Sequence, residues 1–146
     1  MANFIYQNFK HRLAQALVNM GTADFRVLLA MTNTTADTEK NADNIADFTL
    51  LDECDGANYG RIDLAGVSLT RDDPNAIVYM DASDAVFVNL GAGTRQNQGA
   101  VLFIFVTADA DHVNAAWIDT GGFPFDGTGS NNTIQWNALG IVQLTG

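Results

Sequence analysis

The strongest constraint on the fold is the segment of residues 100–107, AVLFIFVT, which is the most hydrophobic run in the chain. It is too short for a membrane-spanning helix, which needs roughly 20 apolar residues. An uninterrupted apolar run of this length is typical of a strand that is buried on both faces of its sheet. We therefore expect residues 100–107 to form the central strand of a sheet.

Further segments have apolar residues with a period of two, and turn residues separate these segments. Gly66 interrupts one such alternation, and a bulge or bend there would place four apolar side chains on one face: Ile62, Leu64, Val67 and Leu69. The expected strands besides the central one are residues 25–31, 62–64, 67–69, 77–80, 85–90, 115–119, 133–136 and 139–144.

One turn is expected before residues 77–80 and another after them. Residues 72–75 (DDPN) predict a turn, because proline fixes φ and the residue before it avoids the helical region. Residues 81–84 separate two expected strands, residues 77–80 and 85–90, which suggests a hairpin with a four-residue loop.

The first segment of the chain has a helical period instead. Its apolar residues recur every three or four positions, so residues 4–20 are expected to form an amphipathic helix with these on one face: Ile5, Phe9, Leu13, Leu17 and Met20. Asn3 is a candidate N-cap, and Gly21 can end the helix in a left-handed conformation. Residues 45–53 suit a second, short helix with Asn44 as its cap.

Two polar segments lie between the expected elements. Residues 33–44 (NTTADTEKNADN) contain no large apolar side chain and predict a surface loop or a mobile arm. Residues 91–99 (GAGTRQNQG) predict a loop, and their glycine spacing matches neither phosphate-binding pattern.

These elements predict a mainly β fold, an antiparallel β-sandwich or barrel with an N-terminal amphipathic helix and one further short helix. The chain has 146 residues, which is near the commonest size of one domain. We expect residues 1–146 to be one structural domain, with the helix at residues 4–20 and the β domain at residues 24–146.

The charge, the cysteine count and the polarity of the first residues each exclude a class of partner, cross-link or targeting segment. Seven Lys and Arg against 17 Asp and Glu give a formal net charge of −10, which repels phosphate backbones and argues against direct nucleic-acid binding. The acidity is explained equally well by solubility alone. Cys54 is the only cysteine, so no intrachain disulfide is expected. The polar residues within residues 1–20 exclude a signal-peptide core and a membrane span there.

No residue pattern predicts catalysis or a cofactor. His11 and His112 are the only histidines, and both are expected at the surface. Cys54 lies between Glu53 and Asp55, whose charges disfavour a thiolate. Paired carboxylates at Asp72/Asp73 and Asp81/Asp84 fall in expected turns, where nothing desolvates a general acid. We expect a protein that is not an enzyme.

Two segments resemble metal-binding loops only weakly. Asp109, Asp111 and His112 have an alternation that can converge ligands on a metal, and residues 126–132 (DGTGSNN) could wrap a calcium ion. The same residue types are what turns use, so a Gly-rich hairpin loop is favoured and no metal is assigned.

Large apolar residues in predicted loops are more informative than the weak metal-binding patterns. Phe123, Pro124 and Phe125 lie in GGFPFDGTG, where a monomer is normally polar. They predict either a protein contact or a loop folded over the end of the sandwich. Phe4 and Tyr6, at the start of the expected helix, are the other candidate contact residues.

Several of these pieces resemble a family. They are Asn58-Tyr59-Gly60-Arg61, residues 118–122 (IDTGG) and residues 134–144, which are similar to segments of small virion structural proteins of tailed bacteriophages. The resemblance runs loosely over most of the chain and departs from the pattern at residues 71–99. It implies a capsid decoration or cement subunit, or a tail or head-fibre component, and it implies no catalytic residue.

The expected function is therefore structural. The chain would bind between major capsid protein subunits, and to copies of itself, on the exterior of a virion after synthesis in the host cytoplasm. A tail or head-fibre role is the alternative within the same class. From another class, a carbohydrate-binding β-sandwich module would use Trp117, Trp136 or Tyr79 as stacking platforms, although strand tryptophans are more often buried.

Overall fold

The computed structural model describes residues 3–145 as a mainly β fold of antiparallel sheets with one α-helix near the N-terminus, which confirms the predicted fold class. The helical elements are α1 (Gln7–Ala14) and the 3-10 helix η1 (Ile45–Asp47). The strands are β1 (Phe4–Ile5), β2 (Phe25–Met31), β3 (Ile62–Asp63), β4 (Ser68–Asp72), β5 (Ile77–Asp81), β6 (Ala85–Leu90), β7 (Asn97–Ile104), β8 (Val113–Ile118), β9 (Ser130–Ile134) and β10 (Val142–Thr145).

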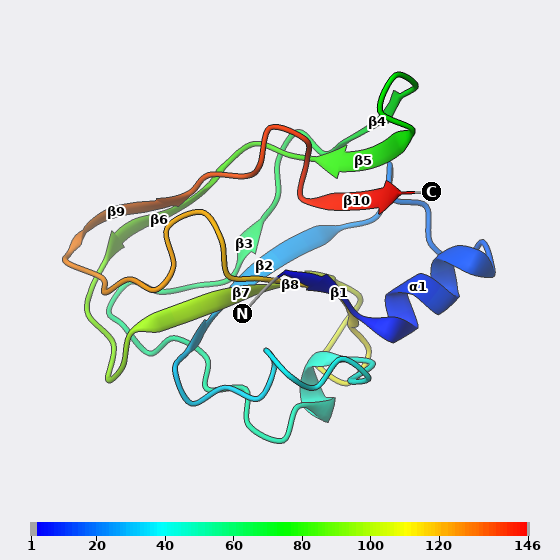
Figure 1. Cartoon of the computed structure of the whole chain (residues 1–146). Coiled ribbons are helices and arrows are strands. Elements are labelled where there is room, and N and C mark those ends of the chain that lie inside the picture. The colour runs from blue at the N-terminus through cyan, green and yellow to red at the C-terminus, as the bar shows by residue number, and fades with distance from the viewer. Residues whose placement is uncertain (1–2, 146) are drawn as a thin grey trace.

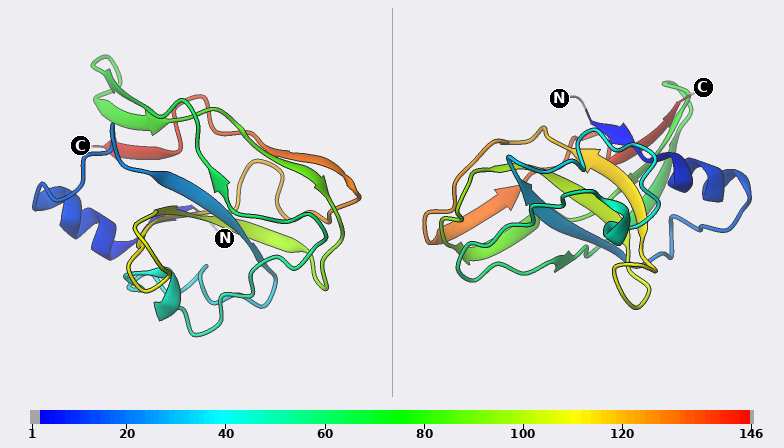
Figure 2. Two further views of the ribbon diagram at one scale, coloured as in Figure 1. Left: turned by 180° about the vertical axis from the view of Figure 1, so that it is seen from behind. Right: turned by 90° about the horizontal axis from the view of Figure 1, so that it is seen from below.

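The elements form three layers (Figure 1). The middle layer is a five-stranded sheet in the order β1-β8-β7-β2-β3. One face of it packs against α1, against a three-stranded sheet (β10-β5-β4) and against a two-stranded sheet (β6-β9). The other face is covered by the connection between β2 and β3, as the view from behind also shows (Figure 2). Both faces of the middle sheet are therefore buried.

Strand β7 is the central strand of this sheet, as its sequence predicts. It pairs with β2 from Phe25↔Ile104 to Met31↔Asn97 and with β8 on its other side. Residues 99–104 are all buried. The strand begins at Asn97, inside the predicted loop of residues 91–99, because Asn97 also exchanges backbone hydrogen bonds of 2.9 and 3.0 Å with Phe125.

The N-terminal helix is shorter than predicted. Residues 4–5 form strand β1, which pairs with β8 through Phe4↔Trp117, and α1 ends at Ala14. Ala16 then takes a left-handed conformation with φ of 57°, which prevents the helix from continuing. The predicted apolar face is broken there, so Leu17 is 63% exposed although Phe9 is buried.

The predicted hairpin of residues 77–90 is wrong. The chain turns at residues 73–76, as the DDPN segment predicts, and β5 pairs with β4 and β10. Strand β6 pairs instead with β9 in another sheet. Alternation along a strand does not identify its partner, because backbone ladders bond any extended segment equally well.

Residues 33–44 form a surface loop that packs on the middle sheet. Ala36 and Ala42 are buried against the middle sheet, and the Tyr6 hydroxyl donates a 2.7 Å hydrogen bond to the Ala36 carbonyl. The Asn114 backbone N–H donates to the Asp43 carbonyl at 3.0 Å. Small side chains let this segment lie flat on the sheet, where large ones would hold it away. Of the expected second helix, only Ile45–Asp47 is helical.

Candidate functional site

The five predicted contact residues differ in their accessibility. Tyr6 is fully buried, so its side chain offers no exposed surface for the predicted partner contact. Phe4 is half-buried and packs edge-to-face on Tyr6, with ring centroids 5.0 Å apart. Phe123 and Phe125 are half-buried against the core beside β6 and β9, with their rings 5.3 Å apart, which favours the folded-back loop. Only Pro124 is exposed.

Arg61, from the segment that carries the family resemblance, joins two carboxylates. Its Nε and Nη2 donate to the two Glu53 oxygens at 2.8 Å each, and its Nη1 and Nη2 donate to Asp109 at 2.6 and 3.1 Å. The hydrogen bonds from Arg61 hold the pKa of Asp109 below its usual range. Arg61 thereby ties the connection that precedes β3 to the loop between β7 and β8.

Tyr59 extends this network into the core. Its hydroxyl donates to Glu53 at 2.8 Å and accepts the Leu29 backbone N–H at 3.1 Å. Burial, followed by the Glu53 charge, raises the pKa of Tyr59. Its ring stacks on Phe87 of β6. Every polar group in this cluster has a structural partner, so the motif fastens the fold and presents no reactive group.

His112 is buried, with 4% of its surface exposed, so its predicted surface position is wrong. Its Nδ1 accepts the Val106 N–H at 3.1 Å, and its ring packs on Phe103 and Phe105. Burial lowers the pKa of His112, and the nearby Asp109 only partly opposes this. His11 is exposed, as expected.

Acidification is expected to destabilise the protein through His112. The unfolded chain binds this proton with a pKa near 6.5 and the folded chain binds it less readily, so the free energy of unfolding falls as the pH drops through and below about 6.5. Each unit of depressed pKa is worth about 1.4 kcal/mol. Urea unfolding at pH values between about 7.5 and 5 should show a shallower pH dependence in His112→Gln than in the wild type. His11→Gln is the matched control and should follow the wild type, and equal slopes in all three proteins would contradict the argument.

The weak metal candidates are engaged in protein contacts. Asp109 binds Arg61, and Asp111 accepts the Thr107 hydroxyl. In residues 126–132, Asp126 accepts the Gln96 amide at 3.1 Å and the Asn131 side chain accepts the Asn89 N–H at 3.0 Å. Across residues 3–145, no three His, Cys, Asp or Glu side chains are grouped so that they could hold a metal ion together.

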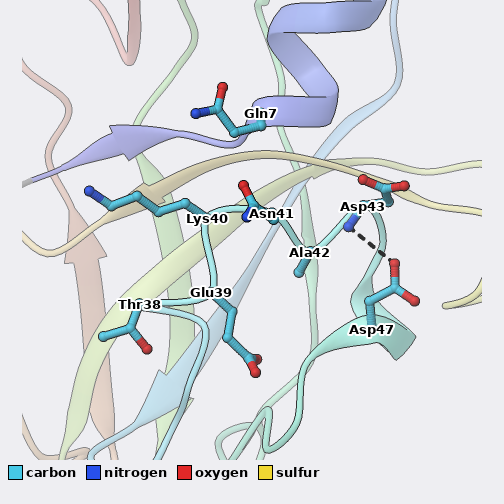
Figure 3. Close-up of a pocket in the computed structure, with 8 residues that line it drawn as sticks. All are labelled: Gln7, Thr38, Glu39, Lys40, Asn41, Ala42, Asp43 and Asp47. Carbon is cyan, nitrogen blue, oxygen red and sulfur yellow. Dashed lines mark hydrogen bonds between the residues drawn. The ribbon is translucent and has the colours of Figure 1, made fainter.

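A surface depression of about 730 Å³ lies between α1 and residues 38–47 (Figure 3). Two of its carboxylates, Asp47 and Glu39, hold the loop itself. Asp47 accepts the Asp43 and Asn44 N–H groups at 3.1 and 3.2 Å, and Glu39 accepts the Thr35 hydroxyl at 2.6 Å and the Thr49 N–H at 2.9 Å. Burial would raise the pKa of Glu39, but these hydrogen bonds outweigh it and lower the pKa. The hydrogen bonds of Asp47 and Glu39 thus hold this loop in its folded form.

Cys54 and the two tryptophans are buried or half-buried in the fold. Cys54 is buried, and burial raises the pKa of its thiol. Trp117 is fully buried, so it is not available as a stacking platform for a sugar. Trp136 and Tyr79 are half-buried, and the Trp136 indole N–H donates to the Ser83 carbonyl at 3.0 Å.

An apolar groove is the surface feature that the sequence analysis missed. It has a volume of about 380 Å³ and lies between the end of α1 and the three-stranded sheet. Its lining, which we call the apolar groove, is Leu13, Ala16, Val18, Asn19, Met20, Leu69, Val78 and Leu144. Leu69 and Leu144 are 48% and 38% exposed. The bend at Gly66, with φ of 66°, directs Leu64 and Val67 into the core but leaves Leu69 beyond its edge.

No helix in residues 3–145 combines the length and the apolar character needed to cross a membrane. Comparisons of the chain with protein-family models, with curated proteins and with solved structures found no match.

Proposed function

We propose that this chain is a virion structural protein of a tailed bacteriophage, and that it is a capsid decoration or cement subunit on the outside of the head. It would bind between major capsid protein subunits and stabilise the shell. The observation that carries the proposal is the apolar groove, because apolar side chains gathered at one open site are typical of a surface that binds protein.

The rest of the molecule supports a passive, rigid role. The middle sheet is covered on both faces, and the Arg61 network links the connection between β2 and β3 to the loop between β7 and β8. A rigid subunit loses little conformational freedom when it binds, so a contact of ordinary size suffices. Many copies on one particle would add their contributions through avidity. The net charge of −10 fits a position on the outside of the DNA-filled capsid better than one inside it, because phosphate groups repel acidic proteins.

Purified virions test the proposal directly. Mass spectrometry with copy-number estimation should find the chain in numbers comparable to the major capsid protein, and cryo-EM should place it on the head. A copy number typical of a tail or head-fibre component would support that alternative, and absence from the particle would reject both.

The groove has its own test. Leu144→Asp should abolish binding of the purified chain to heads that lack it, because a carboxylate cannot be buried there without a partner. Leu139→Asp is the matched control, since Leu139 is 43% exposed and does not line the groove. Equal binding by both variants would show that the groove is not the contact.

A further inference from the structure

Strand β4 is a free sheet edge. In the order β10-β5-β4 it has a neighbour on one side only, and the β4–β5 hairpin extends beyond the middle sheet (Figure 1). Ser68, Leu69 and Arg71 are exposed, and Thr70 and Asp72 are half-exposed. Proteins usually protect such edges with charged side chains, proline or a bulge; β4 has two charged residues near its end, Arg71 and Asp72, but no proline and no bulge.

The hydrogen bonding of β5 shows which peptide groups of β4 are free. The Ile141 N–H donates to the Met80 carbonyl at 2.7 Å, so the peptide groups of Met80 face β10. Consecutive residues of an antiparallel strand bond to opposite neighbours, so Tyr79 faces β4 and bonds with its partner Thr70. Leu69 and Arg71 therefore direct their N–H and C=O groups away from β5, and no other segment within residues 3–145 bonds to them.

We propose that β4 pairs antiparallel with β4 of a second copy, across a two-fold axis at Thr70. This register pairs Leu69 with Arg71 of the partner subunit and Arg71 with Leu69 of the partner subunit, so that every free peptide group of the two strands is bonded. The two three-stranded sheets become one six-stranded sheet. The contact is isologous and closes as a dimer.

Charge favours this register over the one centred on Arg71. Centring the pair on Thr70 places Asp72 opposite Ser68 of the partner subunit and the two Thr70 side chains opposite each other, which is a favourable cross-strand pair. Centring it on Arg71 would place two guanidinium groups opposite each other, which is destabilising.

This contact deepens the proposed function, since a dimer doubles the number of grooves that one decoration unit presents to a shell. Dimer formation is measured on the purified chain alone. A monomeric chain and a chain that does not bind virions are therefore separate results.

Disulfide trapping tests the register. Opposed side chains of such a pair have Cβ atoms about 5 Å apart, close to the separation that a disulfide needs. Thr70→Cys should form a covalent dimer on mild oxidation. Ser68→Cys and Asp72→Cys should each form no covalent dimer alone and should cross-link when mixed. The wild type controls for the buried Cys54, and Thr133→Cys, on an exposed site of β9, controls for random collision.

Sedimentation equilibrium tests the association itself. The wild type should have about twice the monomer mass of 15.7 kDa, and Thr70→Lys should have the monomer mass because two like charges would meet at the axis. A monomeric wild type at its highest soluble concentration, or cross-linking of Thr70→Cys no faster than that of Thr133→Cys, would overturn the inference.

Discussion

Trp117→Ala is expected to lower the free energy of unfolding by about 4 kcal/mol, because removal of a large buried aromatic side chain leaves a cavity. Trp117 is fully buried on β8, in the core cluster that the β2–β3 connection covers. Its indole N–H donates to Asp119 at 3.2 Å. Urea unfolding followed by circular dichroism measures the change without relying on tryptophan fluorescence.

Trp136→Ala is the control for this prediction. Because Trp136 is half-buried, its substitution should lower the free energy of unfolding markedly less. Gly99 provides an internal check. A Cβ atom there would lie 2.2 Å from the Trp117 ring, so Gly99→Ala should be destabilising in the wild type and less so in the Trp117→Ala background. Equal costs for the two tryptophan substitutions, or additive costs for Gly99 and Trp117, would contradict the packing described for this face.

Arg61→Met is expected to lower the free energy of unfolding by about 2 kcal/mol, because it leaves Glu53 and Asp109 without their common cation. This is less than for a fully buried pair, since a quarter of the Arg61 side chain and 46% of the Asp109 side chain are exposed. Arg61→Lys should recover only part of the loss, because an ammonium group cannot form two bidentate contacts. Urea unfolding near neutral pH is the measurement.

Arg71→Met is the matched control for Arg61→Met. Arg71 also pairs with a carboxylate, Asp73, but both side chains are mostly exposed, and such surface pairs contribute little. The protein should be dilute in this comparison so that association through β4 does not enter. If Arg71→Met lowered the free energy of unfolding as much as Arg61→Met, the Arg61 network would contribute no more than an exposed surface ion pair.

The candidate site was only partly predictable. Phe123 and Phe125 were identified from their unusual place between glycines, and the alternative of a folded-back loop agrees with their packing. Leu69 was expected on the same face as Val67 because their alternation is regular, and nothing local shows that the core ends before it. His112 was assigned to the surface because its neighbours are polar, whereas its burial depends on Phe103 and Phe105 from the adjacent strand end.

The sequence by itself determined most of the extended segments and the turn between β4 and β5, but it did not indicate β1. Period-two alternation identified β2 and β6, the uninterrupted apolar run identified β7 as central, and Asp72 to Asn75 identified a turn, because these signals depend on neighbours within a few residues. Only the tertiary structure decided that β5 joins β4 and β10, that β6 joins β9, and that residues 33–44 cover the second face of the middle sheet. Backbone hydrogen bonds are alike in every strand, so the choice of partner is made by side chains that are distant in sequence and meet only in the packed core.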